Sequence, residues 1–419
     1  MKKSIKDLYT RLRSTNILSN FINLTSIQLS NTLLLFITIR IITGNVGIEG
    51  FGMVMFASRF SMLAGTVVNY GTSQSGVKDT ALNLNDSNKL SLVFFNTLFI
   101  RAVIFVLFAA LLLAFSPIRA SSYYYIAIAS PMVLAEVVNP LCFYIGIERI
   151  KVFNVSNMVA NFFAVAAIFI FIHKPQDAPW VNFILGLANV ISYIGLCIYF
   201  ISRFKLKLKL PLKAEILKTS KDNFYLTINN ISAIVQQSII IFALEWSGSE
   251  LLGAYALCDR FISQCRNVLN IISNAVYPNA VNLYKQHREA WAAYRKKSRR
   301  LFAGLFLIGS LLIFVLADVI IYVLSKKHDP DAVVMLRIMG FVPVISAFNV
   351  YGVLDMLLKN RNVYLFRVAV ALIFTGVLVA AVSVCVNNRL LVGAFTIIIE
   401  ACAFCMYEYV LRKPMLDNA

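Results

Sequence analysis

The sequence predicts an all-α polytopic membrane protein with about 12 transmembrane helices in two pseudo-symmetric six-helix bundles around a central cavity. Three observations predict this class. Of the 419 residues, 59% are hydrophobic and only 14% are charged, whereas soluble domains are about 45–50% apolar and about 25% charged. Apolar segments of about 20 residues, each long enough to cross a ~30 Å hydrocarbon core, recur along the chain. The two halves of the chain also repeat one pattern.

Helices are the expected spanning elements because lipid offers no partner for an unpaired backbone group. The alternating segments of about 10 residues that a membrane β-barrel requires are missing. Charged and turn-forming residues separate the apolar segments. The first segment is too long for a signal peptide and lacks a small-residue cleavage site, so we take it as a span. The expected spans are 17–40, 50–72, 91–115, 122–146, 154–173, 180–202, 223–246, 251–275, 300–324, 333–357, 363–386 and 390–411.

The distribution of Lys and Arg predicts the orientation in the membrane. With the N-terminus inside, the inner segments hold 28 of the 39 basic residues and the outer loops hold 6. Cytoplasmic loops carry this excess in membrane proteins, so we expect both termini in the cytoplasm. The same rule explains the net charge of +19, and we expect no nucleic-acid partner.

A basic loop between two spans near the middle of the chain predicts the domain organisation. Residues 203–221 contain seven Lys and Arg residues. We expect an N-terminal six-helix bundle at 1–202, a basic cytoplasmic linker at 203–221 and a C-terminal six-helix bundle at 222–419. The linker is amphipathic, so it either lies on the anionic inner leaflet or is a solvated connection.

The opening helices of the two halves match. Gly52 is followed by six residues and then Arg59 and Phe60, and Gly253 is followed in the same way by Arg260 and Phe261. Six spans per half give a parallel repeat with its axis along the membrane normal, and transporters of this kind bind substrate between the repeats. The first helix of each half carries polar residues on one face, and these face either the cavity or a neighbouring helix. The polar residues expected at the cavity are Asn20, Asn23, Asn31, Asn230 and Gln237.

Several charged residues lie deep within the predicted spans, where a charge costs ~3 kcal/mol or more and marks a functional candidate. The arginines are Arg59, Arg101, Arg260 and Arg266, and the carboxylates are Glu136, Asp259 and Glu400. Arginine binds phosphate oxygens in pairs and stays charged, so we expect these arginines to bind a diphosphate or anionic sugar. The repeat places Arg59 and Arg260 at equivalent depth as a clamp. The alternative is structural pairing with the carboxylates, which are also candidate proton or cation coupling sites.

Motifs of several enzyme classes are absent from the sequence. There is no GxxxxGK(S/T) phosphate loop, no HExxH and no GxSxG, so ATP binding through a P-loop and these hydrolase chemistries are not expected. We expect no catalytic residues, no metal and no cofactor. A membrane-embedded glycosyltransferase remains an alternative, although the outer loops are short for a catalytic domain.

The order of several short features resembles the polysaccharide-transporter branch of the multidrug/oligosaccharidyl-lipid/polysaccharide exporter superfamily, most of all the Wzx-type O-antigen flippases. The features are the polar first helix, the run from Gly47 to Gly52, Tyr70-Gly71, Gly253-Ala-Tyr255 and Val276-Tyr277-Pro278. The resemblance covers the whole chain, and its motifs are specific only in combination.

This resemblance implies a bacterial inner-membrane flippase. It would move an undecaprenyl-diphosphate-linked oligosaccharide, such as an O-antigen repeat unit, from the cytoplasmic to the outer leaflet by alternating access. Its partners would be this substrate, membrane lipids and a polysaccharide polymerase or assembly protein. A drug exporter of the same superfamily is the alternative within the class, but the first helix (17–40) lacks the carboxylate that cation export would need.

Overall fold

The computed structural model describes residues 17–116, 121–209, 213–286, 288–359 and 361–412. Within these ranges the regular structure is helical, with no β-strand. The first half contains α2 (Ile17–Asn69), α3 (Thr72–Leu82), α4 (Ser87–Ala114), α5 (Ser121–Ile128), α6 (Ser130–Val138), α7 (Leu141–Gly146), α8 (Ile150–Phe171), η1 (Pro175–Asp177) and α9 (Ala178–Phe204). The second half contains α10 (Lys213–Trp246), α11 (Leu251–Gln286), α12 (Arg288–Ser325), α13 (Pro330–Met339), α14 (Val342–Leu358), α15 (Asn362–Val386) and α16 (Arg389–Arg412).

Helix α2 contains the first two spans. Gly47 interrupts it with a φ of 81° and a ψ of 171°, a conformation that residues with a Cβ rarely adopt. The chain therefore changes direction at this glycine without leaving helical structure on either side. The break expected between the spans 17–40 and 50–72 lies at Gly47, because glycine tolerates the bend.

The fourth and tenth spans are broken helices rather than the continuous ones expected. The fourth is divided into α5, α6 and α7, with breaks before Pro131 and at Asn139-Pro140. The tenth is divided into α13 and α14 at Gly340, three residues before Pro343. Proline has no backbone N–H to donate to the preceding turn, which explains breaks at these places. Hydropathy does not detect them because the flanking residues are apolar.

Several helices extend beyond the apolar segments. Helix α3 lies in the expected loop 73–90, α10 begins inside the linker 203–221, and α11 continues to Gln286. Asp86 caps α4 by accepting hydrogen bonds from the backbone N–H groups of Lys89 and Asn88. These bonds, that of Lys89 foremost, hold the pKa of the Asp86 carboxyl below its usual value. Such extensions are polar, so a hydropathy pattern does not predict them.

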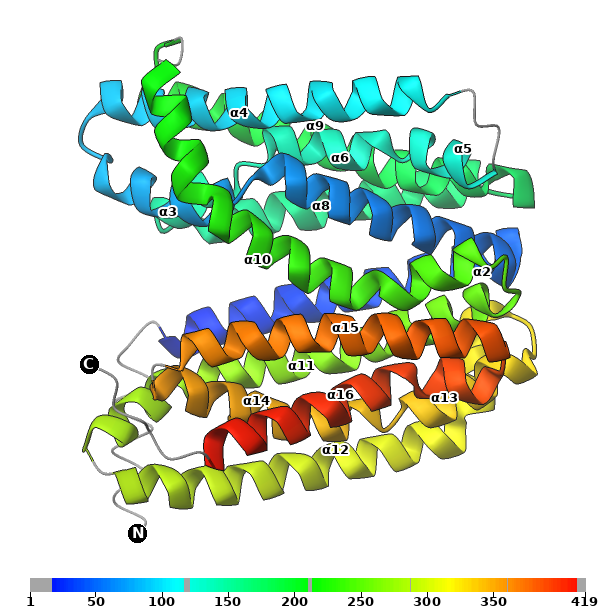
Figure 1. The fold of residues 1–419 in the computed structure, drawn as a ribbon. Coiled ribbons are helices and arrows are strands. Elements are labelled where there is room, and N and C mark those ends of the chain that lie inside the picture. Colours follow the sequence, from blue (N-terminus) through cyan, green and yellow to red (C-terminus); the bar gives the residue numbers. More distant parts are fainter. Residues whose placement is uncertain (1–16, 117–120, 210–212, 287, 360, 413–419) are drawn as a thin grey trace.

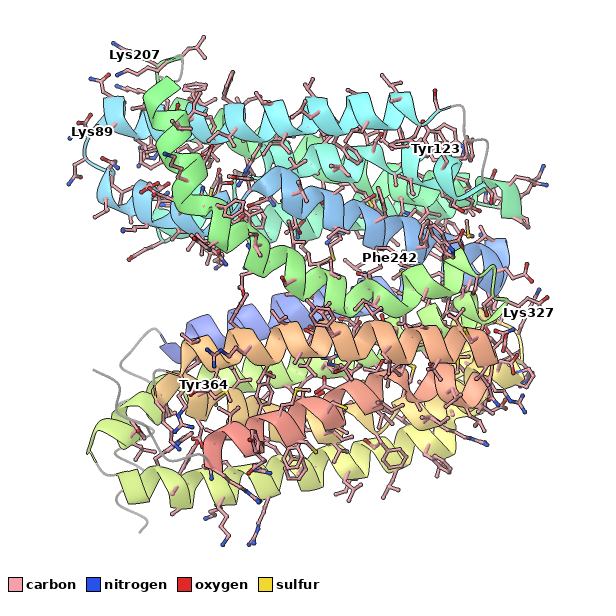
Figure 2. The ribbon with its side chains drawn as sticks, in the orientation of Figure 1. Lys89, Tyr123, Lys207, Phe242, Lys327 and Tyr364 are labelled. Carbon is pink, nitrogen blue, oxygen red and sulfur yellow. The ribbon has the colours of Figure 1, made fainter. Side chains whose placement is uncertain are left out.

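The helices form two bundles that lie side by side (Figure 1). Lys89 and Lys207 lie at one end of the molecule, and Tyr123 and Lys327 lie at the opposite end (Figure 2). We call these the Lys89 end and the Lys327 end. Helix α10 runs obliquely from the first bundle toward the second (Figure 1).

The described chain contains ten helical segments that are long and apolar enough to cross a bilayer. Helix α2 counts once among them although Gly47 divides it into two spans. Helix α11 is not among them because charged residues such as Asp259, Arg260 and Arg266 lower its hydropathy. With these two additions the described chain has twelve spans, and the expected fold class is confirmed.

The two halves touch where α2 crosses α11. A Cβ atom on Gly52 would lie 2.8 Å from the Cα of Gly253, and a Cβ on Gly253 would lie 2.3 Å from the carbonyl oxygen of Ile48. Real Cβ atoms do not approach other atoms so closely, so both positions require glycine. Gly52 and Gly253 are the paired glycines of the sequence repeat. The equivalent helices of the two halves, α2 and α11, therefore contact each other at equivalent positions.

Polar side chains join the halves at the Lys327 end. The hydroxyl of Thr43 donates a hydrogen bond of 2.5 Å to the carbonyl oxygen of Leu324. One turn earlier in α2, Arg40 donates to the carbonyl oxygen of Val323. These contacts connect the last turn of α12 to α2 just before the Gly47 bend. They hold the two bundles together at this end.

Candidate functional site

A polar cavity lies within the first half, next to the α2–α11 crossing. We call it the first-half cavity; its volume is about 270 Å³. Helices α2, α8 and α9 form most of its wall, and α11 adds two side chains from the second half. Its polar lining consists of Thr32, Thr38, Ser58, Asn161, Asn182, Arg260 and Gln264.

A second polar cavity of about 510 Å³ lies within the second half. We call it the second-half cavity. Helices α10, α11, α14, α15 and α16 form its wall, and α2 contributes Arg59 from the first half. Its polar and titratable lining consists of Arg59, Gln236, Gln237, Tyr255, Asp259, Ser263, Arg266, Asn267, Ser346, Asn349, Thr396, Glu400 and Tyr407.

Each of the two repeat arginines lines the cavity of the other half. Arg59 belongs to the first half and lines the second-half cavity, whereas Arg260 belongs to the second half and lines the first-half cavity. Because α2 and α11 cross in backbone contact at Gly52 and Gly253, a long side chain two turns further along either helix reaches past the partner. The sequence predicts one clamp with both arginines on one ligand, but the structure places them in separate cavities.

Arg59 forms an ion pair across the halves. Its Nη2 lies 2.7 Å from Oδ2 of Asp259. The side chains of Arg59 and Asp259 are 11% and 14% exposed, so water screens the pair little. The Nε of Arg59 has no hydrogen-bond partner. The pairing with a carboxylate, which the sequence left as an alternative for Arg59, is present in this conformation.

Arg266 is also held by a carboxylate. Its Nη2 lies 2.7 Å from Oε1 of Glu400, and Oε2 of the same carboxylate accepts a hydrogen bond of 2.6 Å from Nδ2 of Asn349. Helices α11, α14 and α16 are thereby connected through one carboxylate. In the second-half cavity, both arginines therefore have a counter-charge.

Arg260 differs from both. In the part of the chain that the structure describes, its side chain has no hydrogen bond or ion pair. The neighbouring residue Asp259 is its nearest candidate counter-charge, but that carboxylate binds Arg59. The first-half cavity thus contains a guanidinium group that is not neutralised by direct contact.

Arg101 lies outside the lining of both cavities. Its side chain is completely buried. Its Nε donates a hydrogen bond of 2.8 Å to the hydroxyl of Thr72, and its Nη1 donates to the carbonyl oxygens of Glu136 and Asn139. These carbonyls belong to the broken part of the fourth span, between α6 and α7. Arg101 satisfies backbone groups that the Pro140 break leaves without helical partners.

Glu136 is surrounded by amides. Its Oε2 accepts hydrogen bonds of 3.1 Å from Asn69 and 3.2 Å from Asn139. Within the described chain it forms no ion pair. The side chain packs against Gly65, where a Cβ would lie 2.9 Å from its Cγ. Among the three deep carboxylates, only Asp259 and Glu400 hold an arginine.

The expected polar stripe is described only in part. The side chains of Asn20, Asn23 and Asn31 lie outside the described residues, although their backbones belong to α2. Gln237 lines the second-half cavity. Asn230 accepts a hydrogen bond of 3.4 Å from Nε2 of Gln74, so it connects α10 to α3.

Several cavity residues are not among those singled out from the sequence. Thr38, Ser58, Asn161, Asn182 and Gln264 line the first-half cavity. Each is a single neutral polar residue in an apolar helix, and such residues are common at helix–helix contacts. Only their convergence in space separates them from ordinary packing residues.

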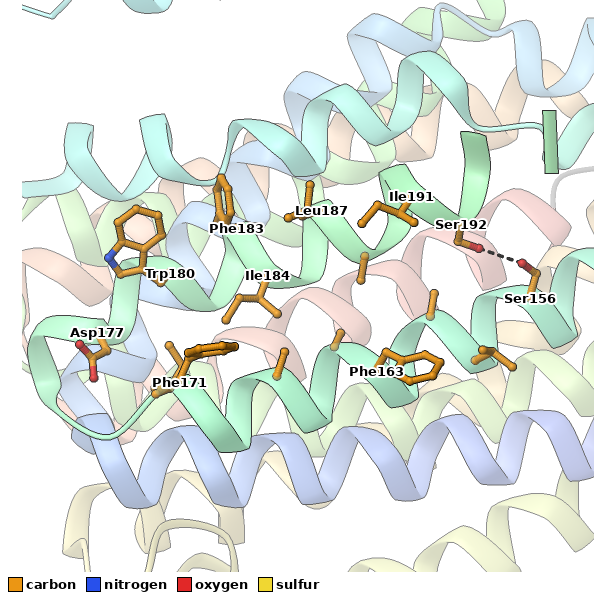
Figure 3. A pocket seen from close by; sticks show the side chains of 16 residues that line it. Ser156, Phe163, Phe171, Asp177, Trp180, Phe183, Ile184, Leu187, Ile191 and Ser192 are labelled. Atoms are coloured by element: carbon orange, nitrogen blue, oxygen red, sulfur yellow. Dashed lines mark hydrogen bonds between the residues drawn. The ribbon is translucent and has the colours of Figure 1, made fainter. Parts of the chain in front are cut away.

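A third and larger hollow, of about 730 Å³, lies between α8 and α9 (Figure 3). Phe163, Phe171, Trp180 and Ile191 line it and are strongly exposed. Ser156 and Ser192 form a hydrogen bond of 2.9 Å at one end (Figure 3). Exposed apolar side chains on a spanning helix are the normal lipid-facing surface, and no charged group except Asp177 lines this groove. We assign it no role in binding a polar headgroup.

Comparison with known proteins identifies the family. The family described as "Polysaccharide biosynthesis protein" matches residues 17–283, which is more than half of the chain. The chain belongs to the polysaccharide biosynthesis protein family. The expected resemblance to the polysaccharide-transporter branch of the exporter superfamily is thereby confirmed.

Relatives of this family member extend over nearly the whole chain. A curated Escherichia coli (strain K12) protein, named as a proposed O-antigen transporter, is 24% identical over 371 residues, which cover 85% of this chain and 88% of that protein. The solved inward-facing structure of a multidrug resistance MATE family transporter of the MOP superfamily is 13% identical, with a TM-score of 0.72, and covers 93% of this chain and 98% of that chain. A eukaryotic MATE transporter is 14% identical, with a TM-score of 0.56 and 94% of each chain covered. At these identities the two solved structures are evidence for the fold.

In this member of the polysaccharide biosynthesis family, the chemistry of the cavities suits reversible binding. Guanidinium groups bind phosphate or carboxylate oxygens, and the amides and hydroxyls of the lining exchange hydrogen bonds with sugars. Arg260 in particular offers a full set of donors inside a membrane domain. Side chains of these kinds can bind a polar, anionic molecule.

Proposed function

We propose that this chain is a flippase for an undecaprenyl-diphosphate-linked oligosaccharide, such as an O-antigen or similar surface polysaccharide repeat unit. It moves this substrate from the cytoplasmic to the outer leaflet of the bacterial inner membrane by alternating access. Its partners are the lipid-linked substrate, membrane lipids and a polysaccharide polymerase or assembly protein. The family and the name of the Escherichia coli relative support this class of cargo.

One observation carries the proposal. Three guanidinium groups, those of Arg59, Arg260 and Arg266, line polar cavities formed by spanning helices of the two bundles. A charge in this position is costly unless it faces a polar space. A lipid-linked sugar diphosphate requires such a space for its headgroup, while its hydrocarbon chain stays in the bilayer.

The proposed cycle follows from the contacts between the bundles. From the excess of Lys and Arg we infer that the Lys89 end and both termini face the cytoplasm. In the present conformation the halves are joined at the Lys327 end, by Thr43 to Leu324 and by the Gly52–Gly253 crossing. Export requires these contacts to break, so that the cavities become accessible from the outer side.

A proton is one candidate source of energy, and the three deep carboxylates are the candidate carriers. Protonation of Asp259 or Glu400 would leave Arg59 or Arg266 without a counter-charge. Among the described residues the Glu136 carboxylate binds only amides, and an amide can also pair with a protonated carboxyl. We therefore favour Glu136 as the proton carrier, if transport is proton-coupled.

Export of cationic drugs is the alternative within the superfamily, and the solved multidrug transporter has the same fold. The first-half cavity disfavours drug export, because Arg260 would repel a cation there and none of the described lining residues is a carboxylate. A membrane-embedded glycosyltransferase is the alternative from another class. It predicts sugar transfer by the purified protein.

Deletion of the gene in its natural bacterium tests the function. We expect surface polysaccharide to be lost, lipid-linked repeat units to accumulate on the cytoplasmic leaflet, and plasmid-borne wild type to reverse both effects. Normal surface polysaccharide in the deletion strain would contradict the proposal. Accumulation of unmodified lipid acceptor, rather than completed units, would favour the glycosyltransferase.

A further inference from the structure

The two copies of the sequence repeat differ in charge at the residue that precedes the central arginine. Arg59 and Arg260 are equivalent in the repeat, and the residue just before each is Ser58 in the first half and Asp259 in the second. Asp259 binds Arg59 across the halves at 2.7 Å. The symmetric counterpart of that contact would join Arg260 to Ser58, and both residues line the first-half cavity. A serine cannot neutralise the guanidinium group.

Because of this difference, the guanidinium charge of Arg260 has an unfavourable free energy in the spanning helix. It lies in a spanning helix, and within the described chain no hydrogen bond or ion pair holds its side chain. A charged group in this position requires an ionic partner or a solvated cavity. In the second-half cavity the protein supplies that partner from its own chain, whereas none of the described residues supplies one in the first-half cavity.

Asn182 provides an independent observation in the same cavity. It is 1% exposed, and its Nδ2 donates a hydrogen bond of 2.8 Å to the carbonyl oxygen of Val54. Its Oδ1 has no partner among the described residues. A buried amide oxygen without a donor costs ~1–3 kcal/mol, so the cavity contains an acceptor that suits a hydroxyl group.

We propose that the first-half cavity is the subsite for a phosphorylated sugar, and that the second-half cavity is not an anion site in this conformation. Arg260 binds the phosphate oxygens, and Oδ1 of Asn182 accepts a hydrogen bond from a sugar hydroxyl. Asn161 and Gln264 supply further amides at the same wall. The proposal rests on the function proposed above and assigns the headgroup to one of the two cavities.

The size of the cavity limits what it binds. Its volume of about 270 Å³ lies just below the range of roughly 300–1,000 Å³ that is typical of small-molecule sites. A whole oligosaccharide does not fit this space. The cavity suits the phosphate and the first sugar, and the remaining sugars lie elsewhere between the bundles.

The repeat itself supplies the sharpest test. Ser58→Asp introduces into the first-half cavity the carboxylate that the second half already has, and Ser58→Asn is the neutral control of similar size. The probe is glucose 1-phosphate, titrated calorimetrically into the purified full-length protein in detergent. We expect Ser58→Asp and Arg260→Gln to weaken binding at least about tenfold and Ser58→Asn to change it less than about threefold, because only the first two remove the free cation.

Other results overturn the subsite. Equal affinity of Ser58→Asp and Ser58→Asn would show that Arg260 does not bind the anion, and so would the absence of binding to the wild type. Glucose is the control ligand for non-ionic binding. Asn182→Leu, which removes the free acceptor, should weaken glucose 1-phosphate more than inorganic phosphate, and equal weakening would remove Asn182 from the subsite.

The same variants separate this inference from the proposed function. Wild-type surface polysaccharide in a strain that expresses Ser58→Asp, together with its loss in the deletion strain, would reject the subsite and leave the flippase intact. Binding that follows the predicted order, together with normal polysaccharide in the deletion strain, would reject the flippase and leave an anion site.

Discussion

Arg59 of the first half and Asp259 of the second are joined by an ion pair of 2.7 Å, one to two turns beyond the point where Gly52 and Gly253 bring α2 and α11 into backbone contact. The pair lies on the wall of the second-half cavity. It therefore connects the two bundles close to the crossing of α2 and α11. The backbone contact at Gly52 and Gly253 and the ion pair between Arg59 and Asp259 belong to the same two helices.

Exchange of the two charges tests whether this pair stabilises the present arrangement. Arg59→Asp and Asp259→Arg each place like charges together, and each should destabilise the protein by about 3 kcal/mol or more, since a buried pair that loses one partner leaves an unpaired charge. The double variant restores an ion pair and should recover much of this loss. Thermal unfolding of the detergent-purified proteins measures the effect, and additive losses in the double variant would contradict it.

Gly253→Ala should weaken the contact between the halves. The added Cβ would lie 2.3 Å from the carbonyl oxygen of Ile48, so α2 and α11 must separate. Gly309→Ala in α12 is the matched control, because a Cβ there meets nothing within 4 Å. Spin labels at positions 174 and 327 report the distance across the Lys327 end.

We expect Gly253→Ala to increase the population with a longer distance between these labels, and Gly309→Ala to leave the distribution unchanged. The same distribution in both variants would mean that the crossing does not hold this end together. If Gly253→Ala fails to fold, the yield of purified protein should fall. Gly253→Ser also adds a Cβ at this position and should show the same loss of yield.

Arg101→Lys should reduce the amount of protein in the membrane more than its activity. A single ammonium group cannot replace the three bonds that Arg101 makes to Thr72 and to the carbonyls of Glu136 and Asn139. We expect the membrane-inserted amount to fall several-fold, with surface polysaccharide per inserted molecule near the wild-type value. A fully inserted but inactive variant would instead place Arg101 among the substrate ligands.

Arg260→Lys should have the opposite effect. Its guanidinium group forms no hydrogen bond or ion pair with a described residue, so insertion and unfolding temperature should stay close to those of the wild type. Export should fall about tenfold, because a lysine keeps the charge but does not bind phosphate oxygens in pairs. Quantifying surface polysaccharide against inserted protein distinguishes this result from the Arg101 case, and wild-type export would contradict it.

Glu136→Gln tests the proposed proton carrier. The amide oxygen of glutamine accepts the same hydrogen bonds from Asn69 and Asn139, so we expect a stable, inserted protein. If transport is proton-coupled, its response to an imposed pH gradient in vesicles should be lost. A preserved response would exclude Glu136 and leave Asp259 and Glu400, whose neutral variants should also lose stability.

The fold followed from the sequence because its determinants are local. Apolar length, the bias of Lys and Arg, and the Gly–Arg–Phe repeat around Arg59 and Arg260 predict twelve spans in two bundles. The breaks at Asn139-Pro140 and Gly340 were not predicted, because the flanking residues are as apolar as those of an unbroken span.

The site was less accessible to sequence reasoning. The deep arginines could be found, but their partners could not, since Asp259 is adjacent to Arg260 in sequence and binds Arg59 in space. The clamp expected for one ligand requires both arginines in one cavity, and the crossing of α2 and α11 sends them into two. The neutral residues Ser58 and Asn182 carry no signal until the cavity is seen.

The most direct test of the central claim is transport by the purified protein. Proteoliposomes contain a fluorescent undecaprenyl-diphosphate-linked oligosaccharide, and an impermeant quencher measures the fraction that reaches the other leaflet. Wild type should exchange the substrate at least about tenfold faster than protein-free vesicles, and Arg260→Gln should return the rate to near that background. A wild-type rate equal to that of protein-free vesicles, or an undiminished rate for Arg260→Gln, would contradict the account.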